Sequence, residues 1–328
     1  RTMNVFMTGG AGYIGSVTAE ILLTSGHQVT IYDNLSRGHL AAIPSGAIYV
    51  NGDIGDRKTL RDALMSANFD IVFHFASLIE AGESMEKPGL YFRTNVSYSN
   101  NVIELAAESG CNRFVLSSTA AVYASSDQPL TEDSPINPAN VYGETKYIVE
   151  RMLTWYQKIY GLRFAALRYF NACGALPGRG EAHDPETHLI PRVLQVALGQ
   201  ADHVNLYGTD YPTPDGTCIR DYIHVADLAE AHLLAANALE HNDTIVYNLG
   251  SGRGYSNQEI IEMAREVTGH DIPVNPADRR DGDATRLVAS YEKIKHELGW
   301  EPANSQLDNI LRTAWEWHSK QSHLYDNA

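Results

Sequence analysis

The sequence is poor in metal-binding and disulfide signals. Its 328 residues include only three cysteines, Cys111, Cys173 and Cys218, which are far apart and form no CxxC pair. Neither a disulfide framework nor a cysteine-rich zinc site is therefore indicated, and we expect a protein of the reducing cytoplasm. The thirteen histidines show no HExxH motif or other cluster at metal-ligand spacing, so we expect no metal site.

Long hydrophobic runs are also missing. No stretch of about 18 consecutive apolar residues occurs, and the first residues lack the basic, apolar and small-residue order of a signal peptide.

Positive charge is scarce as well, because the chain has 25 Lys and Arg but 40 Asp and Glu, which gives a net charge of −15. Such a field repels phosphate polymers and anionic membranes, so we expect neither nucleic acid nor membrane as a partner. An anionic small molecule would need local arginines.

The order of predicted elements indicates the fold class. Strand-like segments alternate with helices that begin at Tyr13, near Arg57, at Pro88 and after Pro138. These strand-like segments are Asn4–Thr8, "QVTIYD", "AIYV", "FDIVFHFA", "RFVLSST" and "RFAALRYF". Such alternation predicts an α/β protein with a doubly wound (Rossmann) parallel sheet that is covered by helices on both faces.

A second, smaller lobe is predicted beyond Asn171, where the texture changes to loops such as "GALPGRGEAHDPE" and "GTDYPTPDGT". A chain of this length also exceeds the usual span of one core. We therefore predict a Rossmann domain over residues 1–170. Residues 171–328 should form mainly a smaller α/β substrate-binding lobe, with some segments returning to the Rossmann domain.

A glycine loop points to a dinucleotide. "TGGAGYIG" places Gly9 or Gly10, then Gly12 and Gly15, between the first strand and the first helix, where the backbone can approach a pyrophosphate. Asp33 ends the second strand about 20 residues later, where a ribose-binding carboxylate is expected. Because this carboxylate would repel a 2′-phosphate, we expect NAD rather than NADP.

Further polar residues follow the strand ends. Asp53 closes the third strand, "FHFA" closes the fourth, and Thr119 closes the fifth.

In "VYGETKY", Tyr142 and Lys146 are four residues apart and share one face if the segment is helical. An ammonium beside a phenol, together with a cationic nicotinamide, lowers a phenol pKa that is otherwise about 10, which suits an acid/base. Taken alone, the two residues also fit an exposed helix pair.

At these motifs the chain resembles the extended short-chain dehydrogenase/reductases and, within them, the UDP-glucose (UDP-galactose) 4-epimerase family. The resemblance runs from Met3 to about Trp317. It rests on "TGGAGYIGS", "YDNLSRG", "HFA", "GESMEKP", "YGETK", "LRYFNACGA", "GTDYPTPDGTCIRDYIHV" and "RRDGDA". Tyr142 and Lys146 match the family's Tyr-x-x-x-Lys, and Thr119 matches its catalytic Ser/Thr.

The resemblance implies contacts with NAD and with the UDP-sugar, and this chain differs from some family members at two positions. The contacts with NAD fall on Gly9, Gly12, Tyr13, Ile14, Gly15, Asp33, Asn34, Asp53, Ile54, Phe75, Ala76, Asn95, Tyr142, Lys146 and Tyr169. Those to the UDP-sugar fall on Thr119, Asn171, Leu189, Tyr207, Arg220, Arg280, Asp283 and Leu287. Ile79 replaces a ribose-binding lysine of some members, and His188 replaces a substrate-binding asparagine.

The reaction that the resemblance implies is reversible oxidation at sugar C4. Tyr142 would remove the hydroxyl proton while hydride passes to NAD, and the 4-keto sugar would turn over and take the hydride back on its other face. UDP-glucose and UDP-galactose would be the substrates, and the cofactor would stay bound. The resemblance also implies a homodimer through helices near Pro88 to Glu108 and Asn140 to Tyr160.

Several alternatives stay open. Arg220 and Arg280 can hold a diphosphate through paired donors, but they can equally pair with Asp221, Asp281 or Asp283. Tyr207 would flank the uracil or be an ordinary core tyrosine.

Rival functions remain as well. A nucleotide-sugar 4,6-dehydratase would need an Asp-Glu pair where this chain has Ala120-Ala121. A 4-epimerase of UDP-N-acetylhexosamines, uronic acids or pentoses shares the same chemistry. A non-catalytic NAD-sensing protein usually lacks the intact Tyr-Lys pair. By resemblance, Leu287 borders the sugar pocket and is intermediate in size between residues that admit and exclude an N-acetyl group.

Overall fold

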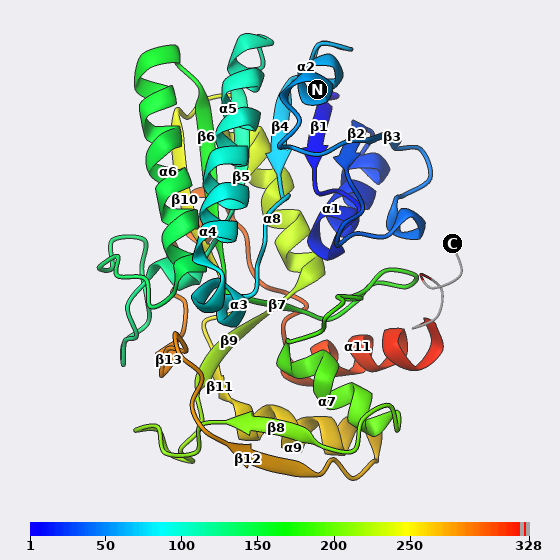
Figure 1. The fold of residues 1–328 in the computed structure, drawn as a ribbon, viewed down its shortest axis with the longest axis vertical. Helices are drawn as coiled ribbons and strands as arrows, with labels where there is room; N and C mark the ends of the chain where they lie inside the picture. Colours follow the sequence, from blue (N-terminus) through cyan, green and yellow to red (C-terminus); the bar gives the residue numbers. More distant parts are fainter. Residues whose placement is uncertain (322–324, 326–328) are drawn as a thin grey trace.

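A seven-stranded parallel sheet forms the middle layer of the larger, upper part of the protein in Figure 1. The computed structural model describes residues 1–321 and 325; residues 322–324 and 326–328, at the end of the predicted second lobe, lie outside the described residues. The strands are β1 (Asn4–Thr8), β2 (Gln28–Asp33), β3 (Ile48–Asn51), β4 (Ile71–His74), β5 (Arg113–Thr119), β6 (Arg163–Tyr169) and β10 (Thr244–Leu249). Their order is β10-β6-β5-β4-β1-β2-β3. The order reverses between β1 and β4, which opens a crevice at the carboxyl ends of these two strands.

Helices cover both faces of this sheet, so the predicted fold class is confirmed. One face carries α1 (Tyr13–Thr24), α8 (Val225–Ala238) and α10 (Glu292–Leu298). The other carries α2 (Arg57–Leu64), α5 (Tyr98–Glu108) and α6 (Val141–Tyr160). The remaining short elements around the sheet are η1 (Leu40–Ala42), α3 (Ala81–Glu86), α4 (Pro88–Tyr91), the π-helical η2 (Phe92–Ser97) and η3 (Ala120–Val122).

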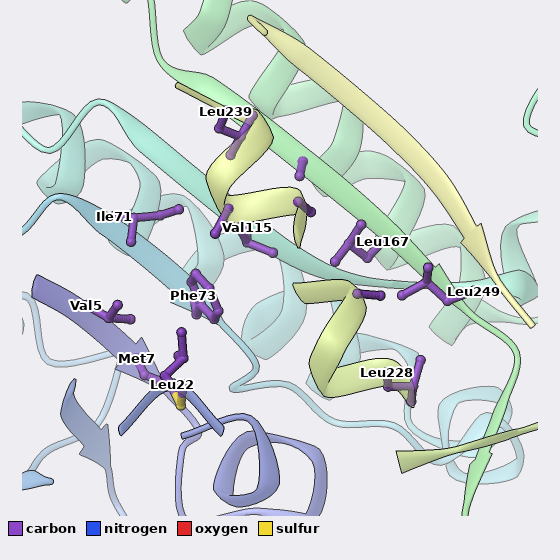
Figure 2. Packing of buried hydrophobic residues seen from close by; sticks show 14 of the residues in the cluster. Val5, Met7, Leu22, Ile71, Phe73, Val115, Leu167, Leu228, Leu239 and Leu249 are labelled. Atoms are coloured by element: carbon purple, nitrogen blue, oxygen red, sulfur yellow. The ribbon is translucent and has the colours of Figure 1, made fainter. Parts of the chain in front are cut away.

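The alternation of apolar side chains along each strand creates two cores. In β1, Val5 and Met7 pack toward α1 and α8, whereas Phe6 between them packs toward α2 and α5, as the two-residue period of a strand requires. Figure 2 shows the first core, where Phe73 and Leu167 from the sheet lie near the α8 helix. Each fully buried side chain of this kind contributes about 1.5–3 kcal/mol, and both sides of the sheet are therefore tied to their helices.

The second lobe is built from short strands and three helices. The strands β7 (Asn171–Cys173), β9 (Ile219–His224), β11 (Gly254–Ser256) and β13 (Arg286–Leu287) form one sheet, and β8 (Val204–Tyr207) pairs with β12 (Val274–Ala277). The helices α7 (Leu189–Ala197), α9 (Asn257–Thr268) and α11 (Leu307–Gln321) share its apolar core. The division at residue 171 stays a prediction, and α8 and β10 belong to the central sheet although they follow it in sequence.

The ends of α6 follow from local chemistry. The Asn140 side chain accepts a hydrogen bond from the Gly143 N–H at 2.8 Å and so caps the first turn. Gly161, at φ +70°, ends the helix in the left-handed conformation that glycine adopts without strain. No helix in residues 1–321 combines the length and the hydropathy that a membrane crossing requires.

A buried ion pair joins α6 to the sheet. The Arg168 guanidinium of β6 donates to the Glu150 carboxylate of α6 at 3.0 Å, and the two side chains are 7% and 6% exposed. The same guanidinium donates to the Tyr123 hydroxyl at 2.7 Å. Because neither charge is solvated, each depends on the other.

We expect Glu150→Ala to lower the free energy of unfolding by about 3–5 kcal/mol, because it leaves the Arg168 charge buried and unpaired. Urea titration followed by circular dichroism measures the change. Asp62→Ala is the matched control, since it breaks the exposed Lys58–Asp62 pair and should cost only about 0–1 kcal/mol. Equal effects of the two substitutions would contradict the assigned role of the buried pair.

Candidate active site

A large cavity lies between the carboxyl ends of the central strands and the second lobe. Its volume is about 950 Å³, at the upper end of the range of about 300–1,000 Å³ typical of ligand sites. The predicted cofactor residues that line it are Gly9, Gly12, Tyr13, Ile14, Gly15, Asp33, Asn34, Asp53, Ile54, Phe75, Ala76, Tyr142 and Tyr169. The predicted substrate residues that line it are Thr119, Asn171, Leu189, Tyr207, Arg220, Arg280, Asp283 and Leu287. The fold thus brings nearly all the predicted residues to one place.

The glycine loop is shaped by backbone contacts that leave no room for side chains. A Cβ on Gly9, at φ +72°, would lie 2.5 Å from the backbone nitrogen of Ala76. A Cβ on Gly15 would lie 2.4 Å from the carbonyl oxygen of Gly9. The loop therefore packs directly on the end of β4 and on the start of α1, and it presents backbone to the cavity.

Asp33 is held in place at the end of β2. Its carboxylate accepts hydrogen bonds from the Ala11 N–H at 3.0 Å and the Leu35 N–H at 2.8 Å. Burial raises the pKa of Asp33, while these two hydrogen bonds lower it.

Asp53 lies two residues beyond the end of β3 and is not the last residue of that strand, and its carboxylate accepts a hydrogen bond from Asn34 Nδ2 at 2.9 Å.

Tyr142 and Thr119 lie side by side in the cavity wall. They come from α6 and from the end of β5, and a Cβ on the neighbouring Gly143 would lie 2.2 Å from the Ala121 carbonyl oxygen. This close packing sets the phenol beside the threonine. Burial raises the pKa of Tyr142 to about 12, hydrogen bonding to Thr119 lowers it, and the Glu80 charge raises it further. In the protein without a dinucleotide, desolvation and the Glu80 charge therefore outweigh the Thr119 hydrogen bond, and the lowered pKa expected beside a cationic nicotinamide stays a prediction.

Lys146 does not line the cavity although it follows Tyr142 by one turn of α6. Its ammonium donates to the Ser77 hydroxyl at 2.9 Å and to the Ser117 carbonyl at 2.8 Å. Ser77 and Ser117 do line the cavity, so Lys146 lies directly behind its wall. Burial lowers the pKa of Lys146 to about 7.

Asn95 is the other predicted residue that does not line the cavity. It is 1% exposed, and its amide accepts from the Leu78 N–H at 2.8 Å and donates to the Leu78 carbonyl at 2.9 Å. Asn95 therefore fixes the backbone at Leu78, which is part of the cavity wall.

Positive charge gathers in the second-lobe part of the cavity. The Arg280 guanidinium pairs with Asp283 at 2.9 Å and lies 4.9 Å from the centre of the Tyr207 ring. Within residues 1–321, no carboxylate lies within 4 Å of the Arg220 guanidinium. Asp221 instead accepts three backbone N–H groups, from Ser251, Gly252 and Ala289. Pairing with a carboxylate thus occurs at Arg280 but not at Arg220.

Sequence reasoning missed several lining residues. Arg192 of α7 lines the cavity and, together with Asn205 and Arg280, lowers the pKa of Tyr207 although partial burial opposes it. Arg192 lies four residues after His188, outside every motif on which the prediction of the site was based. Glu80 also lines the cavity and acts on Tyr142. Nothing in the local sequence indicates that either side chain faces inward.

The two predicted departures have different surroundings. Ile79 lines the cavity as an exposed aliphatic side chain, which offers a ligand no charge. His188 precedes α7, and its Nδ1 lies 2.8 Å from Glu186 Oε1. The imidazole is therefore engaged within its own loop.

Leu287 lies in β13, opposite Arg220 of β9. It is 9% exposed, lines the cavity and shares an apolar cluster with Phe170 and Ala120. Its side chain thus forms part of the wall on the side of the arginines.

The chain is similar to known UDP-sugar 4-epimerases. Residues 5–250 match the NAD dependent epimerase/dehydratase family. The chain is 47% identical to the UDP-glucose 4-epimerase of Corynebacterium glutamicum over 97% of this chain and 96% of that one. The structure is similar to that of UDP-glucose 4-epimerase from Brucella ovis in complex with NAD, with TM-score 0.91, 44% identity and coverage of 96% and 98%. It is also similar to the enzyme from Bifidobacterium longum in complex with NAD⁺ and UDP, with TM-score 0.93, 33% identity and coverage of 97% and 98%.

Proposed function

The chain belongs to the NAD dependent epimerase/dehydratase family, and from this premise we propose that it interconverts UDP-glucose and UDP-galactose by NAD-dependent epimerisation at C4. This activity is that of an isomerase (EC 5.1.3.2), and the curated relatives of the chain are UDP-glucose 4-epimerases. One observation carries the proposal: a single cavity joins the glycine loop and Asp33 to the Tyr142–Thr119 pair and to the second-lobe arginines Arg192, Arg220 and Arg280. An equilibrium mixture of the two sugars after incubation with UDP-galactose alone tests it.

The residues for NAD are those of the glycine loop and its surroundings. The backbone at Gly12 and the start of α1 suit a pyrophosphate, and the fixed Asp33 carboxylate suits ribose hydroxyls. When bound, NAD supplies the acceptor and donor of the C4 hydride. Because hydride returns to the same sugar, the cofactor is regenerated, and the protein should retain it.

Tyr142 moves the proton of the C4 hydroxyl. With a pKa near 12 its phenol is protonated at neutral pH, so proton removal from the sugar needs stabilisation of the phenolate. Thr119 supplies a hydroxyl at the same point. The buried Lys146 lies behind the cavity wall and supplies positive charge to stabilise the phenolate. A phenolate nearby in turn favours the ammonium form of Lys146. The two side chains therefore act as a coupled pair.

The second lobe holds the nucleotide part of the substrate. Arg192, Arg220 and Arg280 line the cavity, and guanidinium groups bind phosphate oxygens through paired hydrogen bonds. Arg220 has no competing carboxylate among the described residues, so it binds a diphosphate without breaking an ion pair. Asp283 orients Arg280, and the Tyr207 ring beneath Arg280 offers an aromatic face for the base.

We also propose a homodimer in the cytoplasm. Trp155, Ile159 and Tyr160 on α6 are 54%, 66% and 69% exposed, and apolar side chains grouped in this way favour burial against a partner. They lie in the segment implied for the dimer by resemblance. Free cysteines at Cys111, Cys173 and Cys218 suit a reducing compartment. Light scattering in solution measures the mass of the assembly.

Tyr142→Phe should reduce kcat by at least about 10²-fold, because it removes the acid/base hydroxyl, and should leave NAD bound. A coupled assay of UDP-glucose formation measures turnover, and absorbance after denaturation measures retained NAD. Tyr147→Phe is the matched control on the same helix, because Tyr147 does not line the cavity, and it should keep near-normal turnover. Comparable activity of the two variants would show that Tyr142 is not the base.

Asp33→Asn should weaken NAD binding by about 10–100-fold, because it removes charge-assisted hydrogen bonds to ribose. It should also reduce discrimination against NADP, since the repulsion of a 2′-phosphate disappears. Titration of cofactor-free protein with each dinucleotide measures both effects. Asp56→Asn is the control, because Asp56 caps α2 and does not line the cavity. Equal affinity of the native protein for NAD and NADP would contradict the role of Asp33.

Leu287 should set the limit for substituents at sugar C2. We expect strong preference for UDP-glucose and UDP-galactose, with weak turnover of UDP-N-acetylglucosamine, because leucine narrows the cavity less than a phenol ring does. Leu287→Tyr should abolish the weak activity and spare the main one, whereas Leu287→Ser should raise it. Steady-state kcat/KM with both sugar types measures the effect. No response to either substitution would exclude Leu287 as the gate.

A further inference from the structure

A group of four side chains converges in the loop between β7 and α7, and three of them, Glu181, His183 and His188, also line the cavity. Glu181, His183, Glu186 and His188 each offer one atom of the kind that binds metals, and these atoms all lie within 4.8 Å of one another. The four residues follow the spacing E-x-H-x-x-E-x-H, which matches no familiar zinc motif. Only the turn of the loop brings them together.

Four His–Glu separations within this cluster are close to those of ligands around one ion. His183 Nδ1 lies 3.4 Å from an oxygen of Glu181 and 3.4 Å from an oxygen of Glu186. His188 Nδ1 lies 3.4 Å from Glu181 and 2.8 Å from Glu186. With metal–ligand bonds of about 2.05 Å, neighbouring ligands are about 3.3 Å apart in a tetrahedral site and about 2.9 Å apart in an octahedral one.

A network of imidazolium–carboxylate hydrogen bonds explains these distances less well. Such charge-assisted bonds are typically about 2.7–2.9 Å long, and three of the four separations are 3.4 Å. His183 Nδ1 is buried and forms no well-aligned hydrogen bond to any described residue. His188 Nδ1 and its backbone N–H both approach Glu186 Oε1 at 2.8 Å, which leaves the second oxygen of Glu186 facing His183.

The negative charge of the two carboxylates in the cluster also favours a bound cation. The side chains of Glu181 and Glu186 are each 6% exposed, and two buried carboxylates need two positive charges nearby. A divalent ion with two neutral imidazoles would balance the same two carboxylates.

We propose that Glu181, His183, Glu186 and His188 bind a divalent transition metal, with Zn²⁺ as the preferred ion. Two imidazoles and two carboxylates suit Zn²⁺ in a tetrahedral site. Four protein ligands leave no open position for a water or substrate, so the site is structural and adds no chemistry to the reaction. This proposal departs from the expectation that the chain binds no metal, and it is independent of the proposed epimerisation.

The position of the site explains what such an ion does. The His183 ring meets the Tyr13 ring edge-on, with centroids 6.1 Å apart, and Tyr13 starts α1 beside the glycine loop. The Glu181 carbonyl accepts from the Trp317 indole of α11 at 3.0 Å, and the Thr187 hydroxyl donates to Glu80. The ion therefore holds one loop against the first helix, the last helix and the cavity wall. Its binding free energy adds to the stability of the folded chain.

The test begins with metal analysis of the whole protein, purified without chelator. We expect about one Zn²⁺ per chain by mass spectrometry, as for a closed four-ligand site. Removal by a strong chelator should lower the melting temperature, and added Zn²⁺ should restore it. Co²⁺ in place of Zn²⁺ should give the intense visible absorption of a tetrahedral ion.

Variants locate the site. His183→Gln and His188→Gln should each lose the metal and the response of the melting temperature to Zn²⁺. His241→Gln is the matched control, because His241 is an exposed residue that follows α8, and it should keep both. If either cluster variant does not fold, Glu181→Gln and the chelation of the native protein still decide the question. Native protein without bound metal, whose melting temperature responds to neither Zn²⁺ nor chelator, would overturn the proposal, as would metal retained in all cluster variants.

Discussion

Close backbone contact at glycine is the constraint on which the cavity depends. Gly9 packs against the end of β4, and Gly143 packs against η3. A Cβ at either position would lie within 2.5 Å of backbone atoms, closer than real Cβ atoms approach. Any side chain there would push β1 from β4, or α6 from β5. The first shift would displace the surface for the dinucleotide, and the second would part Tyr142 from Thr119.

Electrostatics is arranged locally against the overall charge of the chain. The protein carries a formal charge of −15, yet Arg192, Arg220 and Arg280 meet in one cavity. Lys146 lies behind the same cavity, buried and bonded to Ser77 and Ser117. A low dielectric strengthens interactions between these groups and a bound anion or phenolate. The acidic surface therefore does not oppose binding of a small anion that enters the cavity.

The loop between β7 and α7 connects parts of the fold that are far apart in sequence. It contacts Tyr13 at the start of the first helix and accepts a hydrogen bond from Trp317 in the last. It also forms part of the cavity wall through His183 and Thr187. A cluster of charged side chains in this loop thus bears on the shape of the cavity although it takes no part in proton transfer.

Local sequence signals determined the elements and the central motifs of this protein. An apolar run that ends in hydroxyl residues identifies β5, and a predicted strand from Arg163 ends within one residue of β6. A four-residue spacing is enough to place Tyr142 and Lys146 on one helix, α6. Glycine spacing followed by an acidic strand end is enough to indicate the crevice for a dinucleotide. These signals are readable because strand and helix periods are properties of neighbouring residues.

Only the tertiary structure decided how the side chains meet. It placed β10 beside β6 after a long passage through the second lobe, turned Lys146 behind the cavity wall, and raised the pKa of Tyr142. It also brought Arg192 inward and folded the Glu/His loop onto itself. Burial and long-range contact set these features. Desolvation of a phenol or the convergence of a loop depends on groups distant in sequence, and no local period encodes them.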